Sequence, residues 1–265
     1  MKIETLCEIT QEIRDIISES IASTSDYGEL VTVRPRDITR KIDLVAENAL
    51  DEALRAREIS ARIISEELGD RTVGRDPEVL LVFDPVDGST NATCGIPFFC
   101  TSLALSEKTR GASFNDVTMA AITEISNNTY SAVRGGGAFI NGREITGRMG
   151  GGVRPKPIVS IYSYGVKRIP DGVVELGREV VQRTLGSIAL EICFVAEKRI
   201  DGVIDTRGHI SSYDIMASQL ILREAGGEIT DLDGRPLNRD AGATSIELIA
   251  TRDDRLHKRI VKLLK

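Results

Sequence analysis

The chain has 265 residues, of which 41% are hydrophobic and 28% charged, a balance typical of a globular protein. A net charge of −6 and the lack of any basic block argue against a nucleic-acid partner. Four cysteines without a C-x-x-C pair and only two histidines argue against a disulfide framework, a zinc site and a histidine-based triad. No apolar signal core or bilayer-length apolar run is found, so we expect a cytoplasmic protein with no membrane partner.

In the first part of the chain, apolar residues at helical spacing predict helices over 3–22 and about 39–57, with a polar loop at 23–36 between them. A short strand is expected at 61–65, and a loop rich in Gly, Asp and Pro at 68–78. From about 99 to 145, short alternating apolar segments separated by turn residues predict an antiparallel meander.

Residues 147–157 are rich in Gly and Pro and form the best candidate for an internal boundary. Strands and helices alternate after it. Strands are expected at 158–162, 202–205, 228–231 and 246–250, and helices at 172–183, 187–198, 213–225 and 253–264.

The most informative segment is Leu80-Leu81-Val82-Phe83-Asp84-Pro85-Val86-Asp87-Gly88-Ser89-Thr90-Asn91. Its apolar run predicts a buried strand, which Pro85 is expected to end at Asp84. Gly88 lets the backbone pass close to a ligand, and the two hydroxyl residues after it can begin a helix. Carboxylates are ligands for Mg²⁺, and free N–H groups at a helix start bind phosphate. The segment therefore predicts metal and phosphate held side by side.

Other acidic residues are expected at element ends. Asp43 lies early in the second predicted helix, Glu66 and Glu67 follow a strand, and Asp214 lies in the first turn of a helix that Ser212 would cap. A single acid at a helix start is more often a structural feature that favours the helix dipole. We therefore treat these acids as candidates for a functional site only when all of them are considered together.

In their order along the chain, these segments resemble the inositol monophosphatase and fructose-1,6-bisphosphatase superfamily. The segments that carry the resemblance are 37–43, 66–67, 84–91, 95–98, 137–142, 213–217 and 224–227. The resemblance implies an α+β fold, a layered αβαβα sandwich. In it a metal-binding N-terminal α+β half, residues 1–150, would pack closely against a C-terminal α/β half, residues 151–265. The resemblance also implies hydrolysis of a sugar or polyol phosphate, and a homodimer, since the family is commonly dimeric.

The resemblance further implies that two Mg²⁺ ions share one set of ligand residues, which are Glu66, Asp84, Val86 (through its carbonyl), Asp87 and Asp214. Asp84 would bridge the two ions, and Ser89 would add its hydroxyl to the first. Asp43 and Glu66 would hold a water near a third, weaker metal position, while the Gly88 and Ser89 amides would grip the phosphate. Mn²⁺ is expected to substitute for Mg²⁺, and Li⁺ and Ca²⁺ are candidate inhibitors.

The chemistry is consistent with that arrangement, because so many ionised carboxylates cannot crowd together without cations. Two metals about 4 Å apart can stabilise both the attacking and the leaving oxygen of an in-line displacement. We expect direct attack by a metal-activated water that Glu66 orients, with the Ser89 hydroxyl and Asp43 as helpers and with no phosphoenzyme.

Substrate recognition is expected mainly from Arg207, where animal-type inositol monophosphatases carry a glutamate that contacts inositol hydroxyls. A guanidinium cannot accept those hydrogen bonds but can pair with an anion. The segment around it resembles archaeal family members that often accept both inositol phosphate and fructose 1,6-bisphosphate. A surface arginine that caps a loop is the structural alternative. Further candidates are the turn Gly186, Ser187 and Ile188 and the cluster Tyr162, Tyr164, Lys167 and Arg168, which is equally well interpreted as a solvated loop.

Three other functions could share parts of this pattern. In a haloacid-dehalogenase-like phosphatase the two acids of the motif are two residues apart, whereas Asp84 and Asp87 are three apart. A 3′(2′),5′-bisphosphate nucleotidase stays open, although no aromatic-rich platform for a base is evident. A non-catalytic regulatory homologue is disfavoured, because all the matched ligand residues are present.

Overall fold

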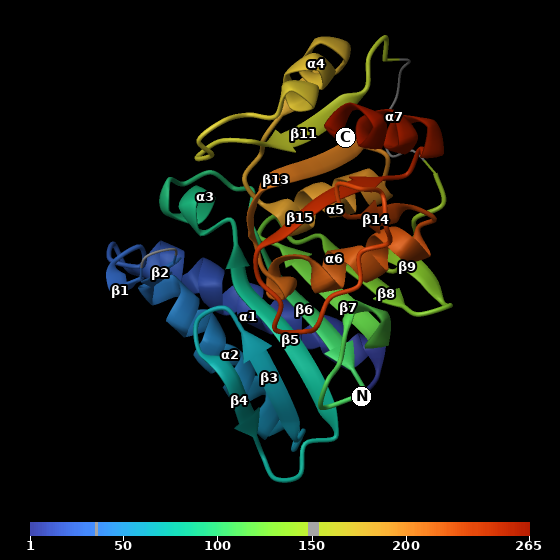
Figure 1. Cartoon of the computed structure of the whole chain (residues 1–265). Coiled ribbons are helices and arrows are strands. Elements are labelled where there is room, and N and C mark those ends of the chain that lie inside the picture. Colours follow the sequence, from blue (N-terminus) through green and yellow to red (C-terminus); the bar gives the residue numbers. More distant parts are fainter. Residues whose placement is uncertain (35–36, 148–153) are drawn as a thin grey trace.

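The computed structural model describes residues 1–34, 37–147 and 154–265, and it has five stacked layers (Figure 1). The layers are helices α1 (Ile3–Ser23) and α2 (Lys41–Ala56), an eight-stranded sheet, helices α5 (Ile188–Ala196) and α6 (Ser212–Glu224), a five-stranded sheet, and helices α4 (Asp171–Glu179) and α7 (Asp254–Leu264). The expected αβαβα sandwich is confirmed.

The eight-stranded sheet has the order β10-β9-β8-β7-β6-β5-β3-β4. Its strands are β3 (Ala61–Ser65), β4 (Gly69–Val73), β5 (Val79–Asp87), β6 (Cys100–Ser106), β7 (Val117–Glu124), β8 (Thr129–Val133), β9 (Gly137–Ile140) and β10 (Arg143–Glu144). Strands β6 to β10 form the antiparallel meander that was predicted from about residue 99 to 145. β5 pairs antiparallel to β6, and β3 pairs parallel to β5. The prediction of a loop over 68–78 is wrong, because β4 lies there as a polar edge strand with only Val73 buried.

Strand β5 continues past Asp84, so the expectation that Pro85 ends it is wrong. The pairing with β6 is irregular at this point, since Asp84 lies opposite Ser102 but Asp87 lies opposite Cys100. A proline has no N–H to donate to a ladder and fits where the pairing is interrupted. The irregularity leaves both acids on a buried strand end.

The five-stranded sheet has the order β12-β11-β13-β15-β14. Its strands are β11 (Ile158–Tyr162), β12 (Val181–Arg183), β13 (Gly202–Ile210), β14 (Glu228–Thr230) and β15 (Ile246–Thr251). β11, β12 and β13 run parallel, so their carboxyl ends share one edge of the sheet. The helix predicted over 172–183 ends earlier, because Val180 and Val181 are β-branched and β12 pairs with β11. Strand β13 extends five residues beyond the predicted end at 205.

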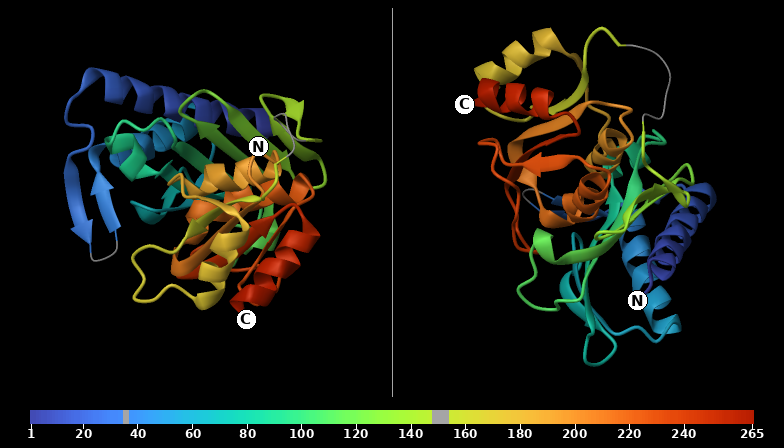
Figure 2. Two further views of the ribbon diagram at one scale, coloured as in Figure 1. Left: turned by 90° about the horizontal axis from the view of Figure 1, so that it is seen from above. Right: turned by 90° about the vertical axis from the view of Figure 1, so that its right-hand side faces the viewer.

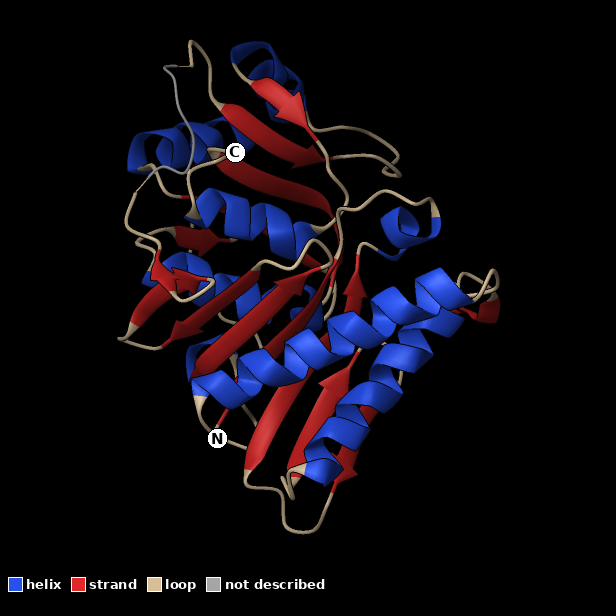
Figure 3. Ribbon diagram, turned by 180° about the vertical axis from the view of Figure 1, so that it is seen from behind, coloured by secondary structure: helices blue, strands red, loops and turns tan. Residues whose placement is uncertain are grey.

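Separate apolar cores join the layers. One lies between α1, α2 and the eight-stranded sheet, a second surrounds α5 and α6 between the two sheets, and a third lies under α4 and α7. Figure 3 shows α1 and α2 lying across the back of the eight-stranded sheet. Figure 2 shows from the side that α4 and α7 lie at the opposite end of the molecule from α1 and α2.

A hairpin of β1 (Leu30–Arg34) and β2 (Asp37–Arg40) replaces part of the loop predicted at 23–36. Its β-branched residues favour strand conformation, although Leu30 and Val31 are exposed. In the described part of the chain, no helix combines the length and hydropathy that crossing a bilayer requires. The division into halves at residue 150 stays a prediction, and its boundary falls largely on residues 148–153, outside the described residues.

Candidate metal centre

Acidic side chains from three elements converge at one edge of the eight-stranded sheet. Ser65 of β3 lies opposite Phe83 of β5 in a parallel pair, so the next residue of each strand, Glu66 and Asp84, emerges at the same edge. Asp214 reaches this point from the first turn of α6, the helix between the two sheets. Residues that lie up to about 150 positions apart in the sequence thereby form one cluster.

The geometry of the cluster fits a divalent cation. Glu66, Asp84 and Asp214 each offer a carboxylate oxygen, and the three oxygens lie within 4.8 Å of one another. Asp84 is buried, and its Oδ1 accepts the Val86 N–H at 3.0 Å. Oxygen donors at this spacing are the ligands that Mg²⁺ and Ca²⁺ prefer. The described residues could therefore hold such an ion at this edge.

The same crowding disfavours ionisation of these acids in the absence of a cation. Burial, followed by the negative charges of Glu66 and Asp87, raises the pKa of Asp84 well above its usual value. Burial also raises the pKa of Asp214 to about 7, although the Ser211 N–H favours its ionised form. A bound divalent cation would reverse both effects, because it stabilises carboxylates over carboxylic acids.

Two of the acids also cap helices, as the structural interpretation of such residues predicts. Asp214 Oδ2 accepts the Ser211 N–H at 2.6 Å, and Asp43 Oδ2 accepts the Arg40 N–H at 2.7 Å. The predicted cap at Ser212 is thus wrong by one residue, because Ser211 precedes the helix in extended conformation. Capping uses one carboxylate oxygen of each acid, and a carboxylate has a second.

Asp87 makes a different set of contacts, which join the eight-stranded sheet to helix α5. Its Oδ2 accepts the Ser187 hydroxyl at 2.5 Å and the Ala189 N–H at 2.8 Å, and its Oδ1 accepts the Ile188 N–H at 3.2 Å. Burial raises its pKa to about 6, although these hydrogen bonds favour the charged form. The turn predicted to meet sugar hydroxyls therefore binds this carboxylate at the start of α5.

The segment after Asp87 is held tightly against the C-terminal half. Gly88 adopts φ +98°, and a Cβ there would lie 3.1 Å from the Gly186 carbonyl oxygen, so only glycine fits. Ser89 then begins α3 (Ser89–Thr93), as predicted, and is partly exposed. Asn91 Nδ2 donates to the carbonyls of Phe98 and Leu185, each at 2.7 Å.

Arg207 lies in a defined position near the acids. Its Nε and Nη2 donate to Asp205 Oδ2 at 2.9 and 2.5 Å. Its guanidinium carbon lies 4.5 Å from the ring centroids of both Tyr162 and Tyr164. The structure therefore brings these four side chains together at the carboxyl end of β11 and beside it in the middle of β13.

The other two members of the predicted basic cluster lie elsewhere on the same loop. Lys167 is exposed, and Arg168 is exposed and paired with Asp171, with Nη2 to Oδ2 at 2.8 Å. This arrangement matches the solvated-loop interpretation of that segment.

Sequence reasoning missed several partners of the site. The Thr39 hydroxyl donates to the buried carboxylate of Glu67, and the Tyr162 hydroxyl donates to the buried carboxylate of Glu191. The pairing of Asp205 with Arg207 could have been predicted from the sequence. Residues i and i+2 of a strand lie on the same face, and Arg207 follows Asp205 by two positions. The two long-range pairs had no such local signal.

Comparison with known proteins gives matches over nearly the whole chain. The model of the inositol monophosphatase family matches residues 2–265. A fructose-1,6-bisphosphatase of Pyrococcus furiosus is 34% identical over 248 residues, covering 91% of this chain and 89% of that protein. A fructose-1,6-bisphosphatase/inositol-1-monophosphatase of Methanothermobacter thermautotrophicus is 33% identical over 261 residues, covering 92% and 90%.

Solved structures are also similar to this chain over its whole length. A Pyrococcus horikoshii protein described as having similarities to inositol-1 monophosphatase superposes with a TM-score of 0.81 at 28% identity, covering 100% of both chains. The predicted family resemblance and the layered fold are both confirmed.

Proposed function

The chain belongs to the inositol monophosphatase family, and on this premise we propose that it is a Mg²⁺-dependent phosphatase that hydrolyses a sugar or polyol phosphate. The observation that carries the proposal is the cluster of Glu66, Asp84 and Asp214, with carboxylate oxygens within 4.8 Å of one another. Bound Mg²⁺ would act there as a Lewis acid, would lower the pKa of water and would stabilise the departing alkoxide.

The ligand set would be completed by the Val86 carbonyl, and by Asp87 through lone pairs that its hydrogen bonds to α5 leave available. Glu66 would accept a hydrogen bond from the attacking water and orient it, with Asp43 and the Ser89 hydroxyl as helpers. Attack would be direct, with no covalent intermediate on the protein. The Gly88 and Ser89 amides would bind the phosphate at the start of α3.

The substrate class is proposed from the relatives and from Arg207. The two relatives described above carry fructose-1,6-bisphosphatase or inositol-1-monophosphatase in their names, which supports sugar and polyol phosphates over nucleoside bisphosphates. A guanidinium held in place by Asp205 and two aromatic rings is suited to bind a second anionic group of the substrate.

A phosphate-release assay with Mg²⁺ tests the proposal. It compares inositol 1-phosphate, fructose 1,6-bisphosphate and adenosine 3′,5′-bisphosphate, each with Mg²⁺, with Mn²⁺ and with excess EDTA. We expect metal-dependent release from the first two and little from the third. Release that is unaffected by EDTA, or none from any substrate, would argue against a metal-dependent phosphatase. Adenosine bisphosphate as the preferred substrate would favour the nucleotidase alternative.

Replacing Arg207 by glutamine should weaken the use of a bisphosphate more than that of a monophosphate. Loss of one charge-assisted pair is expected to lower kcat/KM for fructose 1,6-bisphosphate by about tenfold and that for inositol 1-phosphate by less. Arg75→Gln is the matched control, because Arg75 is exposed on a remote loop. Equal losses of kcat/KM on both substrates would show that Arg207 does not determine substrate preference.

A cytoplasmic location stays a prediction that rests on the sequence, and a homodimer stays a prediction that rests on the family. Light scattering coupled to size-exclusion chromatography would measure its mass directly, and a monomer would exclude the dimer.

A further inference from the structure

One buried carboxylate outside the acidic cluster collects hydrogen bonds from two other segments of the chain. Glu191 of α5 has no exposed surface. Its Oε1 accepts the Leu185 N–H at 2.8 Å and the Ser160 hydroxyl, and its Oε2 accepts the Tyr162 hydroxyl. Donors at both oxygens replace the hydration that a carboxylate loses on burial. Glu191 is therefore an acceptor that the fold holds in one position.

The turn before α5 connects Glu191 to the candidate metal centre. Leu185 donates its N–H to Glu191, and its carbonyl accepts Asn91 Nδ2 at 2.7 Å. Two residues later, the Ser187 hydroxyl donates to Asp87 Oδ2 at 2.5 Å. Glu191 thus has a fixed position relative to Asp87 of the eight-stranded sheet.

The hydroxyl of Tyr162 connects Glu191 to Arg207. The Tyr162 side chain is buried, and the guanidinium carbon of Arg207 lies 4.5 Å from its ring centroid. The ring of Tyr164 lies at the same distance from that carbon, but Tyr164 is 58% exposed. An exposed ring moves more readily than a buried ring whose hydroxyl is hydrogen-bonded, so Tyr162 is the rigid support of the guanidinium. Asp205 holds the same guanidinium at Nε.

We propose that Glu191 is a positioning residue, which fixes Arg207 relative to the acidic cluster by anchoring the Tyr162 ring. The inference rests on the proposed function, in which Arg207 pairs with a second anionic group of the substrate. A substrate with two anionic groups spans the acidic cluster and the guanidinium, so it requires a fixed distance between them. Glu191 itself would not contact the substrate, because it is completely buried.

Tyr162→Phe removes only the anchoring hydroxyl and keeps the ring beside Arg207. The kcat/KM for fructose 1,6-bisphosphate should fall by about fivefold, through KM, the effect of losing one hydrogen bond. The kcat/KM for inositol 1-phosphate should change by less than about twofold, because this substrate has no second anionic group to place. Tyr130→Phe is the matched control, since the Tyr130 hydroxyl donates to the buried carboxylate of Glu197 at 2.5 Å, at the other end of α5.

Two substitutions of Glu191 separate the effect of its hydrogen bonds from that of its charge. Glutamine has an oxygen for Leu185 and Ser160 and an N–H for the Tyr162 oxygen, so Glu191→Gln should retain wild-type kinetics. Glu191→Leu offers no acceptor and should show at least the selective loss expected for Tyr162→Phe. Thermal unfolding verifies that each variant is folded, and Tyr162→Phe decides the matter if Glu191→Leu does not fold.

Hydrogen exchange of the Arg207 Nε–H, measured by NMR in the metal-free protein, tests the positioning without any turnover. Exchange should be about fivefold faster in Tyr162→Phe and Glu191→Leu than in the wild type. It should be unchanged in Glu191→Gln and Tyr130→Phe.

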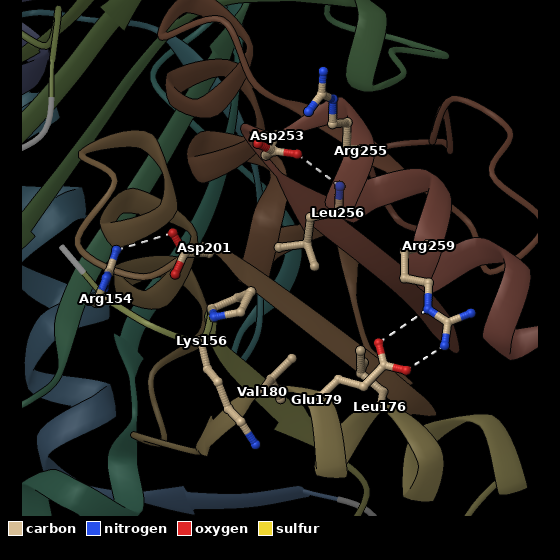
Figure 4. Close-up of a pocket in the computed structure, with 11 residues that line it drawn as sticks. Arg154, Lys156, Leu176, Glu179, Val180, Asp201, Asp253, Arg255, Leu256 and Arg259 are labelled. Atoms are coloured by element: carbon tan, nitrogen blue, oxygen red, sulfur yellow. Dashed lines mark hydrogen bonds and ion pairs between the residues drawn. The ribbon is translucent and has the colours of Figure 1, made fainter.

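Arg259 provides an internal reference for these exchange rates. It belongs to α7, on the opposite face of the five-stranded sheet from α5, and its Nε donates to Glu179 Oε2 at 3.1 Å beside the cavity between α4 and α7 (Figure 4). The exchange rate of its Nε–H should be the same in every variant.

The two measurements separate this inference from the proposed function. A wild type that releases no phosphate would refute the proposed function, and the exchange of Arg207 would still decide the role of Glu191. Exchange that is unchanged in Tyr162→Phe, or equally accelerated in Tyr130→Phe, would overturn the positioning role. Equal losses of kcat/KM on the two substrates in Tyr162→Phe would also overturn it.

Discussion

Replacing Asp84 by asparagine should lower kcat for phosphate release by on the order of a thousandfold. Asp84 lies at the centre of the cluster, and the charges of Glu66, Asp87, Asp214 and Asp43 all act on it. An amide has nearly the same shape as the carboxylate but lacks its negative charge, so the cation that the cluster is proposed to hold would bind poorly. The measurement is the rate of phosphate release at saturating Mg²⁺.

The fold should survive this change, because asparagine can still accept the Val86 N–H. Asp76→Asn is the matched control. Asp76 is exposed and has a φ of +52°, a conformation that asparagine adopts readily. The control should retain wild-type turnover. Near-normal turnover in Asp84→Asn would refute the assignment of this cluster as the active site.

The metal-free protein should become more stable when one acid of the cluster is neutralised. In the folded chain the pKa of Asp214 is raised to about 7 by burial, whereas its ordinary value is 3.8. Between these two pH values the folded state binds a proton that the unfolded state has lost. The free energy of unfolding therefore falls as pH rises from about 4 to above 7, and the full destabilisation is present at pH 8.

Asp214→Asn removes that effect while keeping an acceptor for the Ser211 N–H. At pH 8 in EDTA, the variant should be more stable than the wild type by about 2 kcal/mol, after allowance for solvent screening of a partly exposed side chain. That corresponds to a Tm increase of about 4–8 °C. The stability difference between the variant and the wild type should be smaller at pH 5. Added Mg²⁺ should raise the Tm of the wild type more than that of the variant.

Differential scanning calorimetry at both pH values, with Asp76→Asn as control, measures these effects. A variant that is less stable than the wild type at pH 8 without metal would show that Asp214 serves mainly as a helix cap. Such a result would remove the electrostatic argument for a cation site at this acid.

The long helices could be predicted closely from the sequence. The helix expected over 3–22 is α1, Ile3–Ser23, because apolar residues at a spacing of three and four mark its buried face. Four short strands were missed, β1, β2, β4 and β12. Each lies at the edge of a sheet or in a separate hairpin, so each has a partly polar sequence, and its pairing partner decides its conformation.

The position of the acids could also be predicted, because the motif around Asp84 combines a buried strand, a turn and a helix start within twelve residues. The hydrogen-bond partners of each acid could not be predicted. Asp87 binds the Ser187 hydroxyl, 100 positions later in the chain, and nothing in the local sequence encodes that contact. The fixed position of Arg207 likewise depends on Tyr162, which comes from a different strand of the same sheet.

The most direct test of the account is a titration of the metal-free protein with Mn²⁺, in which electron paramagnetic resonance measures the free ion. The account predicts saturable binding to the wild-type chain, displacement by Mg²⁺, and severe weakening in Asp84→Asn but not in Asp76→Asn. Equal binding by the wild type and Asp84→Asn, or no saturable binding by the wild type, would contradict the claim that these carboxylates form a divalent cation site.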